Sequence, residues 1–180
     1  MRKTVHSGMT IKTMVLYGLF VALTFVATSF INIRLPLMGN GGLVHLGNVP
    51  LFLAAILCGK KAGAVAGAFG MGLFDVLSGW LAWAPFTFVI VGLMGYVTGI
   101  LSEKLPLKPI FANGIAIFAA LCIKVVGYYF AEVILYQNWF LPLGSIPGNV
   151  MQVSVAAIIV LPLAEVLKRV TPKWVKQGKD

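Results

Sequence analysis

Two charged residues lie eight positions apart inside an apolar stretch, FAALCIKVVGYYFAEVI at 118–134. Lys124 and Glu132 flank Tyr128, and their spacing of four places all three side chains on one face of a helix. A charge near the middle of a bilayer costs roughly 2.5 to 3.5 kcal/mol, so charges that are kept there commonly serve a function. We expect this face to bind a polar molecule or to relay a charge.

The composition places these residues in a membrane protein. Hydrophobic residues make up 59% of the 180 residues, charged residues make up 11%, and the mean hydropathy is +0.96. One soluble core of this size could not bury so much apolar surface. The sequence therefore predicts an integral membrane protein.

Apolar runs predict the elements that position the charged residues. They cover about 11–31, 46–58, 62–79, 84–102, 109–136 and 145–167, which predicts a single all-α domain over 1–180 with six transmembrane helices. The second run is short and contains Gly47 and Pro50 near its start. Such interrupted spans are typical of binding sites in transporters, although a tilted or partly sunken helix explains the short run equally well.

Lysine and arginine residues are distributed unequally between the two ends of these runs. Three precede the first run, two lie between the second and third, two lie between the fourth and fifth, and five follow the sixth. Only Arg34 lies on the opposite side. The excess of twelve basic residues on one side over one on the other predicts that both termini face the cytoplasm. The net charge of +9 is thus a topology signal with affinity for anionic lipids, and we expect no nucleic-acid partner.

This topology gives the polar residues of the spans similar depths. Asp75 on the third run and Asn149 and Gln152 on the sixth fall in the outer third of the membrane. Glu132 lies near the outer end of the fifth run, and Lys124 lies near mid-depth. We therefore expect an outward-facing polar pocket.

Each polar residue also has a purely structural explanation. Lys124 could pair with Asp75, and Glu132 could be solvated near the membrane surface. Amides such as Gln152 often cross-link helices. His45 could be a loop or helix-start residue without a ligand.

Small residues form a second pattern, away from the polar positions. AGAVAGAFGMG at 62–72 includes Gly63 and Gly67, and the first run carries Gly18 and Ala22 at a spacing of four. Small residues at this spacing let another helix approach closely. They predict either internal packing or a surface for the helices of a partner.

Several enzyme classes are excluded by missing motifs. CGKKAG at 58–63 lacks the upstream glycine and the hydroxyl residue of a P-loop, and no H-E-x-x-H zinc motif is present. Cys58 and Cys122 both lie inside apolar runs, which argues against a disulfide or a metal centre. We predict no enzymatic activity, no cofactor and no metal.

Three motifs resemble a known family. FDVLSGW at 74–80, GYYFAE at 127–132 and SIPGNVMQ at 145–152 are similar to motifs of the substrate-binding S component of energy-coupling factor (ECF) transporters. The hydroxymethylpyrimidine/pyridoxine-type subgroup is the most similar. The resemblance covers nearly the whole chain.

The resemblance implies a six-helix vitamin-binding protein of the bacterial cell membrane, which works with a membrane T component and two cytoplasmic ATPases. It implies that the first three helices contact the T component through small residues, for which the chain offers Gly18, Ala22, Gly63 and Gly67. The vitamin would be enclosed by the first loop and the outer parts of the last three helices. The predicted substrate-binding residues are Glu132, Tyr128, Asn149, Gln152, Asp75, Lys124, Trp83 and His45.

Two other classes remain open on the sequence alone. A stand-alone secondary carrier could use Asp75, Lys124 and Glu132 as a relay, although a chain without an internal repeat leaves little room for alternating access. A structural or assembly membrane protein would explain the small residues but would leave the outer polar residues without a role.

Overall fold

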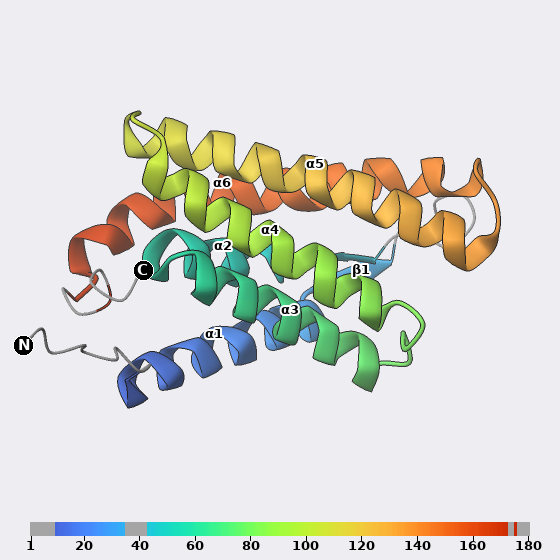
Figure 1. Ribbon diagram of the computed structural model, residues 1–180, viewed down its shortest axis with the longest axis horizontal. Coiled ribbons are helices and arrows are strands. Elements are labelled where there is room, and N and C mark those ends of the chain that lie inside the picture. The colour runs from blue at the N-terminus through green and yellow to red at the C-terminus, as the bar shows by residue number, and fades with distance from the viewer. Residues whose placement is uncertain (1–9, 35–42, 173–174, 176–180) are drawn as a thin grey trace, which may run out of the picture.

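The computed structural model describes residues 10–34, 43–172 and 175. Its helices are α1 (Ile11–Phe30), α2 (Asn48–Cys58), α3 (Lys60–Leu77), α4 (Ala84–Lys104), α5 (Pro109–Tyr136) and α6 (Ile146–Val170) (Figure 1). All six predicted helices are present, and each observed end lies within three residues of its predicted position. Prolines lie in the first turns of α4, α5 and α6 and favour these helix starts. An N–H group in the first turn has no partner within the helix, so proline, which has no N–H, loses no hydrogen bond there.

Three short elements accompany the six α-helices. Strands β1 (Asn32–Arg34) and β2 (Leu43–His45) form an antiparallel pair between α1 and α2, in which Asn32 faces His45. A 3-10 helix, η1 (Leu141–Ser145), leads directly into α6. Over the residues that the structure describes, the fold is therefore all-helical apart from this small antiparallel strand pair, the hairpin.

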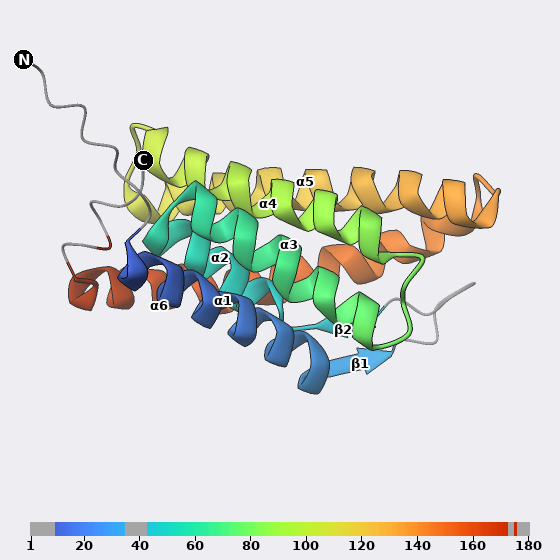
Figure 2. The same cartoon turned by 60° about the horizontal axis from the view of Figure 1, so that its bottom comes forward.

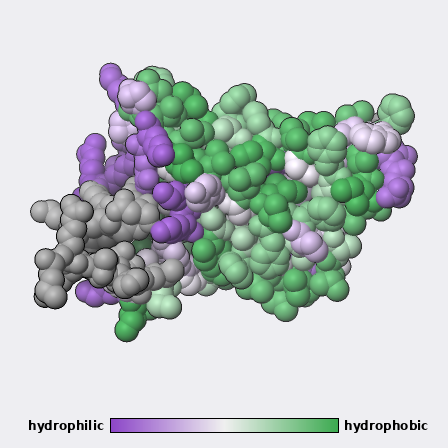
Figure 3. All heavy atoms as spheres, in the orientation of Figure 1, coloured by the Kyte–Doolittle hydropathy of each residue, from purple (hydrophilic) through white to green (hydrophobic). Residues whose placement is uncertain are grey.

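The helices have the lengths and the surface of a membrane protein. α1, α4, α5 and the continuous segment Leu141–Val170 are each long and apolar enough to cross a bilayer. α2 has only 11 residues, and α3 carries two lysines and Asp75 among its 18 residues. Apolar residues dominate the visible surface along the helices, and hydrophilic residues gather at the two ends, with more of them at the left end (Figure 3). The chain is a multi-pass membrane protein.

The core of the bundle is formed around α2. Leu51, Phe52, Ala54 and Ala55 are fully buried, and of the residues of α2 only Val49 is not buried. α1 packs along α3 on one side, whereas α4 and α5 lie together on the other (Figures 1 and 2). The short second run is thus an interior helix, which is why it contains almost no polar residue.

Glycines on α3 permit its close contact with α2 and α4. A Cβ atom at Gly63 would lie 2.5 Å from the Ala55 Cβ and 2.7 Å from the Gly95 carbonyl oxygen. A Cβ atom at Gly67 would lie 2.6 Å from the carbonyl oxygen of Val91. Gly63 and Gly67 are therefore buried packing positions inside the chain, which corrects the expectation that they face a partner. A partner surface requires exposure.

Gly18 and Ala22 differ from the α3 glycines in their exposure. Both lie on the exposed face of α1, and a Cβ atom at Gly18 would meet no heavy atom within 4 Å. The apolar side chains of Val15, Leu19 and Val26 are exposed on the same helix. This face of α1 is free to contact lipid or another helix.

Candidate functional site

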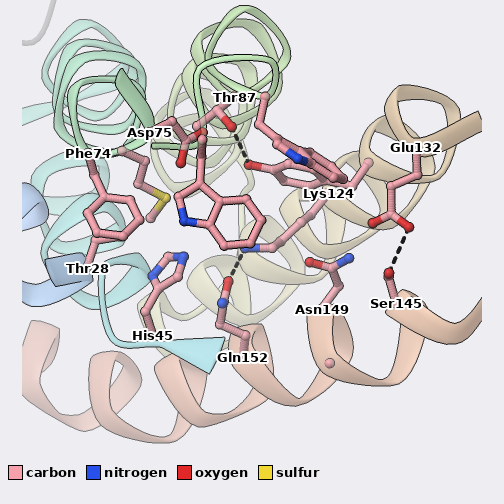
Figure 4. Close-up of a pocket in the computed structure, with 15 residues that line it drawn as sticks. Thr28, His45, Phe74, Asp75, Thr87, Lys124, Glu132, Ser145, Asn149 and Gln152 are labelled. Atoms are coloured by element: carbon pink, nitrogen blue, oxygen red, sulfur yellow. Dashed lines mark hydrogen bonds between the residues drawn. The ribbon is translucent and has the colours of Figure 1, made fainter. Parts of the chain in front are cut away.

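A cavity of about 110 Å³ lies between the end of α3, the start of α4, the last turns of α5 and the start of α6. All eight residues predicted to bind substrate line it: His45, Asp75, Trp83, Lys124, Tyr128, Glu132, Asn149 and Gln152 (Figure 4). The other lining residues are Thr28, Met71, Phe74, Trp80, Thr87, Ser145 and Gly148. Positions more than a hundred residues apart in the sequence are therefore brought into one site.

Helix periodicity and helix ends position these side chains. Lys124, Tyr128 and Glu132 form a row along α5, as their spacing predicts. Asp75 lies near the last residue of α3, and Thr87 lies in the first turn of α4. The cavity is therefore surrounded by helices that end there and by helices that begin there.

Lys124 is the centre of a buried polar network. Only 2% of Lys124 is exposed, and its Nζ donates a hydrogen bond to Oε1 of Gln152. Asn48 Nδ2 donates to the same oxygen over 2.9 Å. The Lys124 ammonium also lies 5.6 Å from the centroid of the Tyr128 ring, within the range of a cation–π interaction. The network connects α5, α6 and the start of α2.

The two carboxyl groups of the cavity are not paired with this lysine. Across the residues that the structure describes, no ion pair joins Lys124 to Asp75 or to Glu132. The suggested structural pair of Lys124 and Asp75 is therefore not formed. Asp75 instead lies beside the Thr87 hydroxyl (Figure 4).

Aromatic side chains form a wall next to Lys124. The rings of Trp83 and Tyr128 are 6.3 Å apart, and Trp80 packs against Trp83 at 6.4 Å. The Tyr128 hydroxyl shares a hydrogen bond of 3.1 Å with Thr87 Oγ1. Flat, fixed rings of this kind favour a planar ligand.

Glu132 occupies a different side of the cavity. Ser145 Oγ donates a hydrogen bond to Glu132 Oε2 over 2.7 Å, and Asn149 lies one turn further along α6. Only 6% of Glu132 is exposed, so it is not a solvated surface carboxylate. A carboxyl group buried with a single hydroxyl partner has further capacity to accept hydrogen bonds from a ligand.

The hairpin contributes His45. The backbone N–H of Gly47 donates to His45 Nδ1 over 3.2 Å, which leaves the imidazole proton on Nε2. Burial and the Lys124 cation lower the pKa of His45 well below its ordinary value, so this side chain is a neutral hydrogen-bond donor. A Cβ atom at Gly47 would overlap Thr28 Oγ1 on α1, so glycine permits the close approach of this turn to α1.

Several lining residues have no signal in the sequence. Thr28, Thr87 and Ser145 carry single hydroxyl groups, which occur widely in membrane helices because they can bond to their own backbone. Met71 and Phe74 are apolar and do not differ in type from residues that face lipid. Three of them were part of a noted motif, Ser145 in SIPGNVMQ, Phe74 in FDVLSGW and Met71 in AGAVAGAFGMG, but none of the three was predicted to line the site.

Comparison with known proteins agrees with this architecture. The sequence model of the family described as ECF-type riboflavin transporter, S component, matches residues 8–169. The chain belongs to this family, and it is thus a substrate-binding membrane subunit of an ECF-type vitamin transporter with a non-enzymatic role in transport.

Two individual proteins are also similar to this chain in sequence. The thiamine precursor transporter HmpT of Lactococcus lactis subsp. cremoris (strain MG1363) is 26% identical over 159 residues, which cover 88% of this chain and 89% of that protein. An uncharacterized protein of Pyrococcus woesei is 35% identical over 78 residues, which cover 43% of this chain and 52% of that protein.

Proposed function

We propose that the cavity binds a single-ring, hydroxylated heteroaromatic vitamin or vitamin precursor, with hydroxymethylpyrimidine or pyridoxine as the first candidates. Its volume of about 110 Å³ carries this proposal. A cavity of roughly 150 Å³ in another protein holds one benzene molecule, so the space here is of the size that one ring needs. The likeness to a thiamine precursor transporter supports the same choice.

The lining residues offer complementary groups for such a ring. Trp83 and Tyr128 would contact its faces, while Lys124 and the Nε2–H of His45 would donate hydrogen bonds to ring nitrogen or oxygen atoms. Asp75 and Glu132 would accept hydrogen bonds from amino or hydroxyl groups. The side-chain amides of Asn149 and Gln152 would complete the contacts from α6.

Mass spectrometry of the small molecule that copurifies with the detergent-solubilised protein tests this proposal. We expect a mass that matches a single-ring vitamin or precursor. Copurified riboflavin would contradict the single-ring assignment. Absence of any bound vitamin, together with no binding of added vitamins, would contradict the function itself.

We propose that all six helices lie across a bacterial plasma membrane with both termini in the cytoplasm. Lys60 begins α3, Lys104 ends α4 and Lys108 precedes α5, and these helix ends lie together at one end of the bundle (Figure 1). The cavity is lined by Asp75 near the end of α3 and Thr87 near the start of α4, at the opposite ends of these helices. Cysteines introduced near Gly41 and Pro142 into a variant without the two native cysteines should react with an impermeant reagent from outside. Cysteines near Lys60 and Lys176 should react only after permeabilisation. Reaction of these cysteines in intact cells would show that the orientation is opposite to the one proposed.

We propose that the exposed small residues of α1 contact a T component, which couples this subunit to two cytoplasmic ATPases. Gly18 and Ala22 lie on an exposed apolar helix face, where small side chains permit close approach. Gly18→Leu should abolish copurification with the T component and preserve vitamin binding. Gly114→Leu is the matched control, since it also has open space at its Cβ position but lies on α5.

The requirement for partners distinguishes this proposal from its rivals. Vitamin uptake should depend on coexpression of the T component and the ATPases. Uptake by the chain alone would indicate a secondary carrier. Neither binding nor uptake would indicate a structural or assembly protein.

A further inference from the structure

The ionisable groups of the cavity are unbalanced toward negative charge. Its lining contains two carboxyl groups, Asp75 and Glu132, against one ammonium group, Lys124. His45 is neutral, and no arginine lines the cavity among the residues that the structure describes. We propose that the cavity selects a vitamin alcohol and rejects its phosphate monoester. This inference rests on the proposed function, because it concerns which form of the vitamin is bound.

The two carboxyl groups lie on different sides of the cavity. Figure 4 shows Asp75 and Glu132 well separated, with Lys124 between them. A phosphate monoester carries a charge of about −1.5 to −2 at neutral pH. A planar ligand with its phosphate at either end would therefore place this charge near a carboxyl group.

The central cation is already engaged by protein groups. Lys124 Nζ donates to Gln152 Oε1 and lies over the Tyr128 ring. A phosphate that took this ammonium would have to replace the hydrogen bond to Gln152. An arginine, which binds phosphate through two parallel hydrogen bonds, is not available in the described lining.

The helix starts around the cavity also provide few free amides. Pro85 in α4 and Pro147 in α6 have no N–H group. The Ile146 N–H donates to the Leu143 carbonyl, and the Ala84 N–H donates to the Trp80 carbonyl over 3.2 Å. Because α3 and α5 end at the same cavity, their dipoles oppose those of the helices that begin there. The amides of Ala84 and Ile146 are therefore not free to bind a phosphate, and Pro85 and Pro147 have none to offer.

Paired ligands test this inference on the full-length protein in detergent. The pairs are hydroxymethylpyrimidine with its monophosphate, pyridoxine with pyridoxine 5′-phosphate, and riboflavin with its 5′-phosphate. Calorimetry and quenching of tryptophan fluorescence would give a dissociation constant for each compound. Because like-charge contacts strongly weaken binding, we expect the ester of the bound vitamin to bind roughly a hundredfold or more weakly than the alcohol.

Variants separate charge rejection from a general loss of the site. Asp75→Asn and Glu132→Gln each remove one negative charge, so the ester-to-alcohol ratio of dissociation constants should fall by about tenfold in at least one of them. Glu103→Gln removes a carboxyl group near the last residue of α4, remote from the cavity, and should leave the ratio unchanged.

Each result has a distinct meaning. Equal or tighter binding of the ester to the unmodified protein would overturn this inference and leave the proposed function in place. An unchanged ratio in both pocket variants would also overturn it. If no alcohol and no ester binds, the proposed function fails and the inference fails with it.

Discussion

The two ends of the helix bundle are built from different kinds of residue. Toward the termini, α3 and α4 meet through Gly63, Gly95 and Gly99, and a Cβ atom at Gly63 would lie 2.7 Å from the Gly95 carbonyl oxygen. Toward the other end, Asp75 on α3 and Thr87 on α4 line a cavity. The same pair of helices is thus closed at one end and contributes to an open site at the other.

This contrast shows how a short chain combines rigidity with a binding site. Close backbone contact through glycines gives extensive van der Waals packing, which stabilises helices in a membrane where the hydrophobic effect between them is absent. At the other end, polar side chains line the cavity, and Lys124 of α5 and Gln152 of α6 form a hydrogen bond with each other. Changes at the two ends should therefore have different effects.

The largest effect should come from filling the closed end. Gly63→Leu would force a side chain into the Ala55 Cβ and the Gly95 carbonyl, and we expect it to destabilise the fold by about 3 kcal/mol or more. Thermal unfolding monitored in detergent would measure this loss. Gly114→Leu, with no heavy atom within 4 Å of its Cβ position, should unfold near the temperature of the unmodified protein. Equal behaviour of the two variants would contradict the described packing.

The next effect should separate stability from binding at the open end. Lys124→Met removes a buried ammonium and should be tolerated in the fold, because a charge inside the membrane is costly. Ligand binding should weaken by about a hundredfold, since the ligand would lose the charge-assisted hydrogen bond proposed for Lys124. Calorimetry and thermal unfolding on the same preparation would check both statements. Undiminished affinity would restrict Lys124 to a structural role.

A smaller effect is expected from Glu132→Gln, which preserves the size of the side chain. Loss of a charge-assisted hydrogen bond worth roughly 1.5 to 3 kcal/mol should weaken binding about ten- to hundredfold. Ser145→Ala removes only the hydroxyl that donates to Glu132, so we expect a smaller loss, by a few-fold. Tryptophan quenching by the copurified ligand would compare the variants. Unchanged affinity in Glu132→Gln would show that this carboxyl group does not bind the ligand.

The closed and open ends also differ in how far the sequence predicts them. Apolar runs predicted the six α-helices, because each must be apolar enough for the bilayer or the interior, but they did not predict the 3-10 helix η1. The spacing of Lys124, Tyr128 and Glu132 predicted their common face. The inferred depths covered the five polar residues of α3, α5 and α6 that line the cavity, whereas they gave no position for His45.

Other features depend on contacts that no local pattern contains. The shared Gln152 oxygen, bonded by Asn48 and Lys124, joins residues from three helices. The hairpin was missed because each strand has only three residues. Gly63 and Gly67 show the same limit, since a small-residue spacing predicts close approach of a helix but not whether that helix belongs to the chain or to a partner.

Direct titration of the purified protein with hydroxymethylpyrimidine, pyridoxine and riboflavin tests the central claim, that the outer cavity holds a single-ring vitamin or precursor. Trp80 and Trp83 line the cavity, so quenching of their fluorescence would report binding at the proposed site. We predict saturable binding of at least one of the two single-ring compounds and no binding of riboflavin. Saturable binding of riboflavin, with neither single-ring compound bound, would contradict the claim.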